Sequence, residues 1–183
     1  MRKVLLFMMV SLDGYYEGPN HEIDWHNADN KEFNDFAIKN VGESDLLLFG
    51  RKTYELMATY WPSADALKND PIVAAQMNNT EKIVFSRTLI KTDWENTRLV
   101  KNNAADELRK LKNQEGKAIA ILGSSDLALT FISEGLIDEF QIMVNPVVLG
   151  AGKPLFDGLK ERIQLALVKT KVFNSGNVLL FYK

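Results

Sequence analysis

Two basic residues begin a predicted helix, a place where acidic side chains are usual. Arg51 and Lys52 follow Gly50, which ends the short apolar run over residues 46–49. The next apolar residues recur with helical spacing and predict one buried face: Tyr54, Met57, Ala58 and Trp61. A helix N-terminus is the positive end of its dipole, so two cations there are unfavourable unless an anion binds. Free N–H groups, a glycine and two cations predict an anion site, most naturally for phosphate; the alternative is two solvated side chains after a loop glycine.

Two further apolar runs also end in small, polar or basic residues. Ser86-Arg87-Thr88 follows residues 82–85, and Gly123-Ser124-Ser125 follows residues 118–122. Each has an ordinary explanation, because serine and threonine favour turns and serine caps helices. The carboxyl ends of parallel strands meet at one sheet edge, however, and these ends together suit a dinucleotide with phosphates at several points. No Gly-x-Gly-x-x-Gly follows the first strand and no Walker motif occurs, which disfavours an ordinary Rossmann fold and a P-loop.

A parallel sheet is the arrangement that would bring these ends together. The runs over residues 4–10, 46–49 and 118–122 are continuously apolar, and residues 82–85 are apolar after Lys82, as in strands covered on both faces; helical patterns separate them. The helix after Ser124 is predicted to bury Leu129, Ile132 and Leu136. Apolar segments flank residues 174–177, which predicts an antiparallel C-terminal hairpin. We therefore predict one mixed α/β domain over residues 1–183.

Two connecting segments differ in character. Residues 14–26 form a long loop rich in glycine, proline, asparagine and aromatic residues, and a loop of this length after a core strand is more often functional than idle. Residues 63–79 are mostly polar and predict one short helix, around residues 72–77.

Composition excludes several classes of function. The net charge of −2 gives no overall field that favours nucleic acid or an anionic membrane. The chain has no cysteine, so it has neither disulfides nor thiolate zinc ligands, and we expect a cytoplasmic protein. No stretch approaches the length of a membrane span. The two histidines, His21 and His26, lack other clear ligands nearby, and we predict no metal site.

Five motifs occur in a recognisable order along nearly the whole chain. They are Ser11-Leu12-Asp13-Gly14, Gly50-Arg51-Lys52-Thr53-Tyr54-Glu55, Ser86-Arg87, Gly123-Ser124-Ser125 and Asn145-Pro146-Val147-Val148-Leu149-Gly150-Ala151-Gly152-Lys153-Pro154-Leu155-Phe156. Each motif alone is weak, but the ordered set resembles the dihydrofolate reductase superfamily. The resemblance is closest to the branch named for the C-terminal reductase domain of bacterial riboflavin-biosynthesis proteins. It implies a mixed sheet of about eight strands flanked by helices, NADPH as hydride donor, and a heterocyclic or ribosylamino substrate.

The resemblance also implies which residues bind the cofactor. Gly50, Arg51, Lys52 and Thr53 would meet its phosphates. Ser86 and Arg87 would face the adenosine end, where an arginine favours the 2′-phosphate of NADPH. Gly123, Ser124 and Ser125 would face the pyrophosphate and the nicotinamide side. Residues 14–25 would form a loop over the nicotinamide.

The catalytic acid does not carry over directly. Where dihydrofolate reductases place a carboxylate on the first helix, an ungapped count from Gly50 reaches Asn34, which cannot ionise. The neighbouring carboxylates Glu32 and Asp35 should point to other faces of that helix. Asp24 and Asp13 are further candidates for the acid. On the substrate side, Asp13, Trp25 and Met57 are the expected contacts.

The leading hypothesis is an NADPH-dependent reductase, most like 5-amino-6-(5-phosphoribosylamino)uracil reductase of riboflavin biosynthesis. Dihydrofolate reduction is an alternative, against which Asn34 argues mildly. A second alternative is a nucleotide-binding protein without turnover, which would keep the phosphate site and lack a proton donor. The antiparallel C-terminal edge and the glycine loop would suit a homodimer interface.

Overall fold

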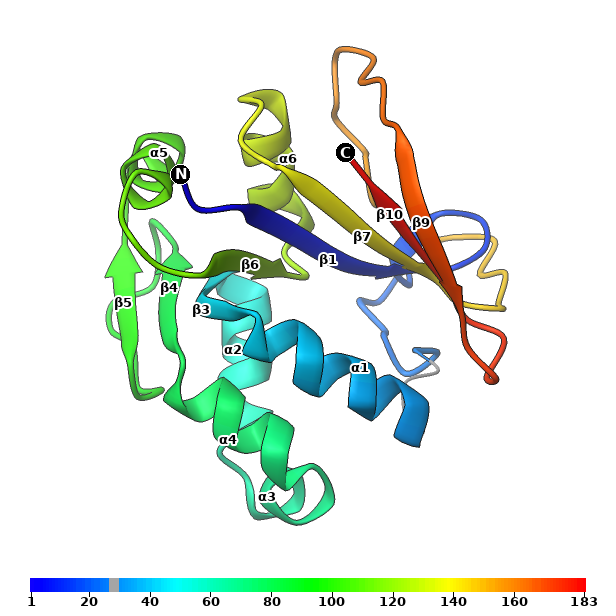
Figure 1. Ribbon diagram of the computed structural model, residues 1–183, viewed down its shortest axis with the longest axis horizontal. Helices are drawn as coiled ribbons and strands as arrows, with labels where there is room; N and C mark the ends of the chain where they lie inside the picture. Colours follow the sequence, from blue (N-terminus) through cyan, green and yellow to red (C-terminus); the bar gives the residue numbers. More distant parts are fainter. Residues whose placement is uncertain (27–29) are drawn as a thin grey trace.

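The computed structural model describes residues 1–26 and 30–183. Eight strands form one mixed sheet in the order β5-β4-β3-β6-β1-β7-β10-β9 (Figure 1). Their bounds are β1 Val4–Val10, β3 Ser44–Gly50, β4 Glu81–Phe85, β5 Thr97–Val100, β6 Ala118–Leu122, β7 Glu139–Val144, β9 Leu167–Val172 and β10 Val178–Tyr182. Neighbouring strands from β5 to β7 pair in parallel, whereas β10 is antiparallel to both β7 and β9. The predicted fold class and the C-terminal hairpin are confirmed.

Helices cover both faces of this sheet. They are α1 Lys31–Gly42, α2 Arg51–Tyr60, α3 Ala64–Asn69, α4 Pro71–Asn79, α5 Ala104–Lys112 and α6 Ser125–Ser133. Helices α5 and α6 lie on one face, and α1, α2 and α4 lie on the other (Figure 1). No helix of the described residues is long and apolar enough to cross a membrane.

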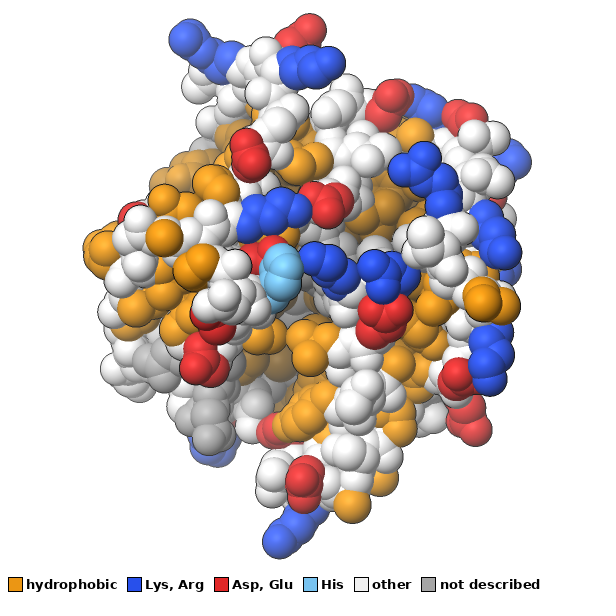
Figure 2. All heavy atoms as spheres, turned by 180° about the vertical axis from the view of Figure 1, so that it is seen from behind, with side chains coloured by type: hydrophobic (Ala, Val, Ile, Leu, Met, Phe, Trp, Pro, Cys, Tyr) orange, Lys and Arg blue, Asp and Glu red, His pale blue; other side chains and the backbone are white. Residues whose placement is uncertain are grey.

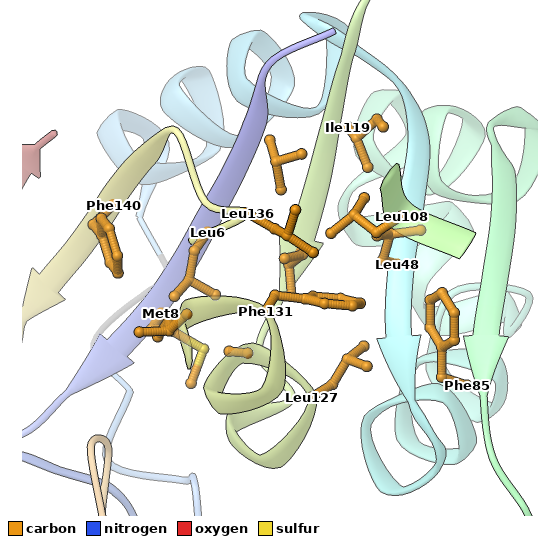
Figure 3. Packing of buried hydrophobic residues seen from close by; sticks show 14 of the residues in the cluster. Leu6, Met8, Leu48, Phe85, Leu108, Ile119, Leu127, Phe131, Leu136 and Phe140 are labelled. Carbon is orange, nitrogen blue, oxygen red and sulfur yellow. The ribbon is translucent and has the colours of Figure 1, made fainter. Parts of the chain in front are cut away.

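The core between the sheet and α6 centres on Phe131, which is fully buried. Figure 3 shows this ring among the side chains of Leu6, Leu48 and Leu127. The predicted buried face of α6 was partly wrong, because Leu129 is only partly buried while Leu127, Ala128, Phe131 and Ile132 face the sheet. The residues at 127, 128, 131 and 132 share one face of α6 because they are spaced by about one helical turn, and this face is buried. Leu136 is also buried, beyond the end of the helix.

Residues 63–79 hold two helices, α3 and α4, where the sequence predicted one. Ser63 caps α3, since its hydroxyl accepts a hydrogen bond from the amide of Ala66. Pro71 stands at the start of α4, where its fixed φ favours a new helix. A separate small sheet joins β2 Tyr15–Glu17 to β8 Lys153–Pro154, and this pairing fixes the long loop after β1.

Candidate functional site

The junction between β3 and α2 leaves backbone donors free at the start of the helix. Gly50 occupies the N-cap in an extended conformation, and no described side chain caps α2. The first turn of α2 contains no acidic residue. Arg51 pairs with Glu55 one turn later, at 3.1 Å, and both side chains remain substantially exposed. Unpaired backbone amides and positive charge therefore lie together at the carboxyl end of β3.

The turn between β6 and α6 lies directly against that junction. Gly123 and Ser124 both adopt left-handed conformations, with φ of +64° and +63°. Ser124 does not cap α6 with its hydroxyl; instead its Oγ accepts a hydrogen bond from the Gly50 amide at 2.9 Å. An ideal Cβ on Gly123 would lie 3.2 Å from Cγ2 of Thr53, so the two turns are packed closely. The ends of β3 and β6 thus form one surface.

The end of β4 adds an unpaired cation to this edge. Phe85 is the sheet partner of Gly50, and Arg87 follows two residues later. The hydroxyl of Ser86 accepts hydrogen bonds from the amides of Thr88 and Leu89, so this serine builds the turn. Arg87 is exposed and forms no hydrogen bond or ion pair within the described part of the chain. Its guanidinium is available to an anionic ligand.

The long loop after β1 reaches across to both helix N-termini. Nζ of Lys52 lies 3.5 Å from Nε2 of His21, and Nδ1 of His21 lies 2.9 Å from Oε1 of Glu17. The same Glu17 oxygen accepts a hydrogen bond from the Tyr16 hydroxyl at 3.1 Å. Figure 2 shows lysine and arginine side chains around a histidine near the middle of one face, beside a hollow in which hydrophobic side chains are visible. The loop therefore borders the edge where the strand ends meet.

Lys153 connects the small sheet to α6. Its Nζ forms an ion pair with Asp126, in the first turn of α6, at 2.6 Å and lies 5.6 Å from the ring centroid of Tyr16. Burial raises the pKa of Tyr16, although the Ser125 hydroxyl and the Lys153 ammonium oppose this change. The phenol is therefore protonated at neutral pH.

His26, at the end of the long loop after β1, is partly buried, and its imidazole is neutral at neutral pH. Burial lowers the pKa of its imidazole to about 4, although a hydrogen bond with the backbone of Tyr16 and the charge of Asp24 act in the opposite direction. Its ring lies edge-on to Trp25, with the centroids 4.4 Å apart. Among the described residues no group of three histidine, aspartate or glutamate side chains could hold a metal ion.

Asp13 holds two loops together. Its carboxylate accepts hydrogen bonds from the amides of Leu149 and Gly150, at 3.1 and 2.8 Å. Hydrogen bonding, first of all with the Ser11 hydroxyl, lowers the pKa of Asp13 to about 2. A carboxylate with this pKa is a poor proton donor at neutral pH.

The other predicted acids have varied surroundings. Asn34 lies on α1, and its side-chain amide donates to Asp70 at 2.7 Å. Asp24 is exposed on the loop. The backbone amide of Asn174 donates to Glu32, and Asp35 pairs with Lys31 on the helix surface.

The two remaining predicted substrate contacts already have partners within the protein. The indole of Trp25 donates to the backbone carbonyl of Glu22 at 3.0 Å. The sulfur of Met57 accepts a hydrogen bond from the Trp61 indole, and the side chain packs with the cluster around Phe49. Both side chains are partly buried, so each keeps some accessible surface.

The sequence analysis did not predict that Tyr16, Glu17, His21 or Lys153 belongs to the site. Their proximity depends on the pairing of β2 with β8, whose partners are more than a hundred positions apart. Gly152 is the one local signal, because its φ is +147° and a Cβ there would lie 2.3 Å from the Glu17 carbonyl oxygen. Only glycine allows the two chain segments to approach so closely.

Comparison with known proteins gives one family over nearly the whole length. The model of the RibD C-terminal domain matches residues 2–179. The uncharacterised protein YyaP of Bacillus subtilis (strain 168) is 38% identical over 182 residues, which are 99% of this chain and 94% of YyaP.

Solved structures show the same fold. A putative riboflavin biosynthesis protein from Shewanella sp. PV-4 matches with a TM-score of 0.76 and 24% identity, covering 98% of this chain and 97% of that one. A diaminohydroxyphosphoribosylaminopyrimidine deaminase/5-amino-6-(5-phosphoribosylamino)uracil reductase from Thermotoga maritima matches with a TM-score of 0.70 and 15% identity, covering 100% of this chain and 56% of that one.

Proposed function

The chain belongs to the RibD C-terminal domain family, a family of reductases, and on this premise we propose that it is an NADPH-dependent reductase of a ribosylamino or related heterocyclic substrate. The observation that carries the proposal is the joined surface at the ends of β3 and β6. The uncapped first turn of α2 meets the Gly123-Ser124 turn through the hydrogen bond between Gly50 and Ser124. A pyrophosphate needs such a combination of backbone amides, close backbone approach and positive charge.

We propose that the residues of the site contact this cofactor along its whole length. Arg51 and Lys52 would stand beside the phosphates, and Arg87 would meet a 2′-phosphate at the neighbouring strand end. The turn at Gly123 and Ser124 would approach the pyrophosphate, with Ser125 and the loop after β1 on the nicotinamide side. When bound, the cofactor would supply a hydride, while the protein orients the reactants and excludes water.

For the substrate, we propose 5-amino-6-(5-phosphoribosylamino)uracil or a close analogue. Support comes from the family and from the Thermotoga maritima protein, whose name includes reduction of this compound. Dihydrofolate is the competing substrate. Asn34 and its bond to Asp70 favour the ribosylamino compound, because an amide cannot supply the charge that the amidine edge of a pterin requires.

A nucleotide-binding protein without turnover is the second candidate, and the non-ionisable Asn34 is the observation that favours it. The deciding experiment mixes the protein with NADPH and follows nicotinamide absorbance after adding either the aminouracil ribosylamine or dihydrofolate. Oxidation with the ribosylamine alone is the expected result. Tight NADPH binding without oxidation by either compound would instead support the second candidate, and absence of NADPH binding would reject both.

A further inference from the structure

A chain of hydrogen-bonding groups leads from the solvent to the Tyr16 phenol. The imidazole of His21 is 62% exposed, whereas the Glu17 side chain is 13% exposed and lies between His21 and Tyr16. A single oxygen of Glu17, Oε1, contacts both neighbours, at 2.9 Å to His21 and 3.1 Å to Tyr16. Three groups hydrogen-bonded in series can pass a proton from one to the next. Imidazole is the side chain best suited to exchange that proton with water.

The inner end of this chain lies beside the turn that is proposed to face the nicotinamide. Tyr16 interacts with Ser125 at the start of α6 and with the Lys153 ammonium, which pairs with Asp126 in the same helical turn. Glu17 is the other charged group that faces the phenol. The nearby ammonium would stabilise a phenolate that forms when the phenol gives up its proton.

We propose that Tyr16 is the proton donor of the reduction, and that Glu17 and His21 return the proton from solvent. This inference rests on the proposed function and names the group that the first-helix alignment does not supply. Asp13 is occupied with loop amides, and Asn34 cannot ionise. Tyr16 keeps its phenolic proton at neutral pH and stands at the strand-end edge of the sheet.

When bound, the cofactor would supply a hydride to the carbonyl or imine carbon of the open ribosyl chain. The π electrons of that double bond move to its oxygen or nitrogen, which takes the proton from the Tyr16 hydroxyl. His21 would then give its Nδ1 proton to Glu17 Oε1, Glu17 would pass a proton to the Tyr16 phenolate, and His21 would take its replacement from water. The substrate would gain one hydride, supplied by the bound cofactor, and one proton, supplied by Tyr16.

The test compares Tyr16→Phe with Tyr182→Phe, a matched change on β10, where Tyr182 pairs with Phe140 near the start of β7 and far from the strand ends that form the site. Single-turnover reduction of the aminouracil ribosylamine is followed by nicotinamide absorbance, and NADPH affinity is measured by fluorescence. We expect Tyr16→Phe to slow the reduction by about 100-fold or more while NADPH affinity stays unchanged, since general acid catalysis contributes on this scale. Tyr182→Phe should match the wild type. Equal rates for the two variants would overturn the assignment.

A second measurement separates the relay from a merely structural tyrosine. In the wild type the rate should fall in deuterium oxide, and in Tyr16→Phe this solvent isotope effect should disappear. Glu17→Gln should slow multiple turnovers more than the first turnover, because it interrupts reprotonation and leaves the phenol in place. A Glu17→Gln enzyme that matches the wild type in both regimes would contradict the relay.

The last measurement needs no turnover. With tyrosine labelled at Cζ, the NMR signal of Tyr16 should move when NADP⁺ is added, and the signal of Tyr182 should not. If wild-type protein binds NADPH but oxidises none of it, the proposed function fails, yet this titration still decides where Tyr16 lies relative to the cofactor. An unmoved Tyr16 signal in cofactor-saturated protein would overturn the inference by itself.

Discussion

The hydroxyl of Ser124 accepts a hydrogen bond from the amide of Gly50 at 2.9 Å and so ties the end of β6 to the end of β3. Ser124 makes this contact in a left-handed conformation, which costs an L-residue roughly 1 kcal/mol. Two substitutions separate the hydrogen bond from the strain. Ser124→Ala should lower the free energy of unfolding by about 1 kcal/mol, because it loses the bond and keeps the strain.

Ser124→Gly loses the same bond, but glycine adopts the left-handed conformation freely. We therefore expect it to be less destabilised than Ser124→Ala in urea unfolding. Equal losses in the two variants would show that strain at this turn does not matter for stability.

Gly123 should tolerate no side chain, for two reasons that can be measured separately. Its φ is +64°, and a Cβ would meet Thr53 Cγ2 at 3.2 Å. Gly135 has nearly the same φ, +63°, but nothing within 4 Å, so Gly135→Ala measures the conformational cost alone. Gly123→Ala should therefore be more destabilised than Gly135→Ala in urea unfolding.

A double variant tests the contact itself. Thr53→Ser removes the methyl group that the new Cβ would meet, so Thr53→Ser/Gly123→Ala should regain part of the loss. If the double variant is no more stable than Gly123→Ala, contact with the Thr53 methyl group is not what destabilises a side chain at position 123.

Arg87 should set the preference for NADPH over NADH. The side chain is exposed and has no ion-pair partner among residues 1–26 and 30–183, so a 2′-phosphate would be its first charged partner. Arg87→Ala should remove about 1–3 kcal/mol of NADPH binding, as expected for a charged hydrogen bond, and leave NADH binding unchanged. Fluorescence titrations with both cofactors measure this difference.

Arg98→Ala is the matched control, because Arg98 stands on neighbouring β5 and is already paired with Glu107. It should alter neither affinity. Equal affinity of the wild type for the two cofactors would contradict the role of Arg87.

The parts of the fold that the sequence predicted depend on local patterns. Apolar runs identified four of the parallel strands, β1, β3, β4 and β6, and the glycine at position 50 marked the start of a helix. The parallel arrangement of these strands then predicted that their carboxyl ends converge, and the bond between Gly50 and Ser124 confirms that the first and last of the three ends meet.

The parts that the sequence did not predict depend on contacts between distant segments. The pairing of Tyr15 and Glu17 with residues 153 and 154 involves strands of three and two residues, too short to show a period. The role of the Ser124 hydroxyl was equally hidden, because serine before a helix ordinarily indicates a cap. Helix α3 has only six residues and lies in a polar segment, so its pattern was too short to recognise.

Lys82 gives the clearest pH dependence of stability in the described structure. It is 1% exposed, and its ammonium donates to the carbonyls of Met77, Asn78 and Thr80, at 2.8, 3.0 and 2.6 Å. Burial nevertheless lowers its pKa from 10.5 to about 8. Below pH 8 the side chain is charged in both the folded and the unfolded protein, so the cost of burying the charge is fully present.

Between pH 8 and 10.5 the folded protein releases this proton first, and unfolding then takes up a proton. The contribution of Lys82 to the free energy of unfolding should therefore rise with pH across this window and level off above it. Urea unfolding of the wild type and of Lys82→Met across this range measures the effect, because subtracting the variant removes the other titrating groups. The difference should shift in favour of the wild type as pH rises; a difference that stays constant would mean that the three carbonyls keep the lysine charged throughout.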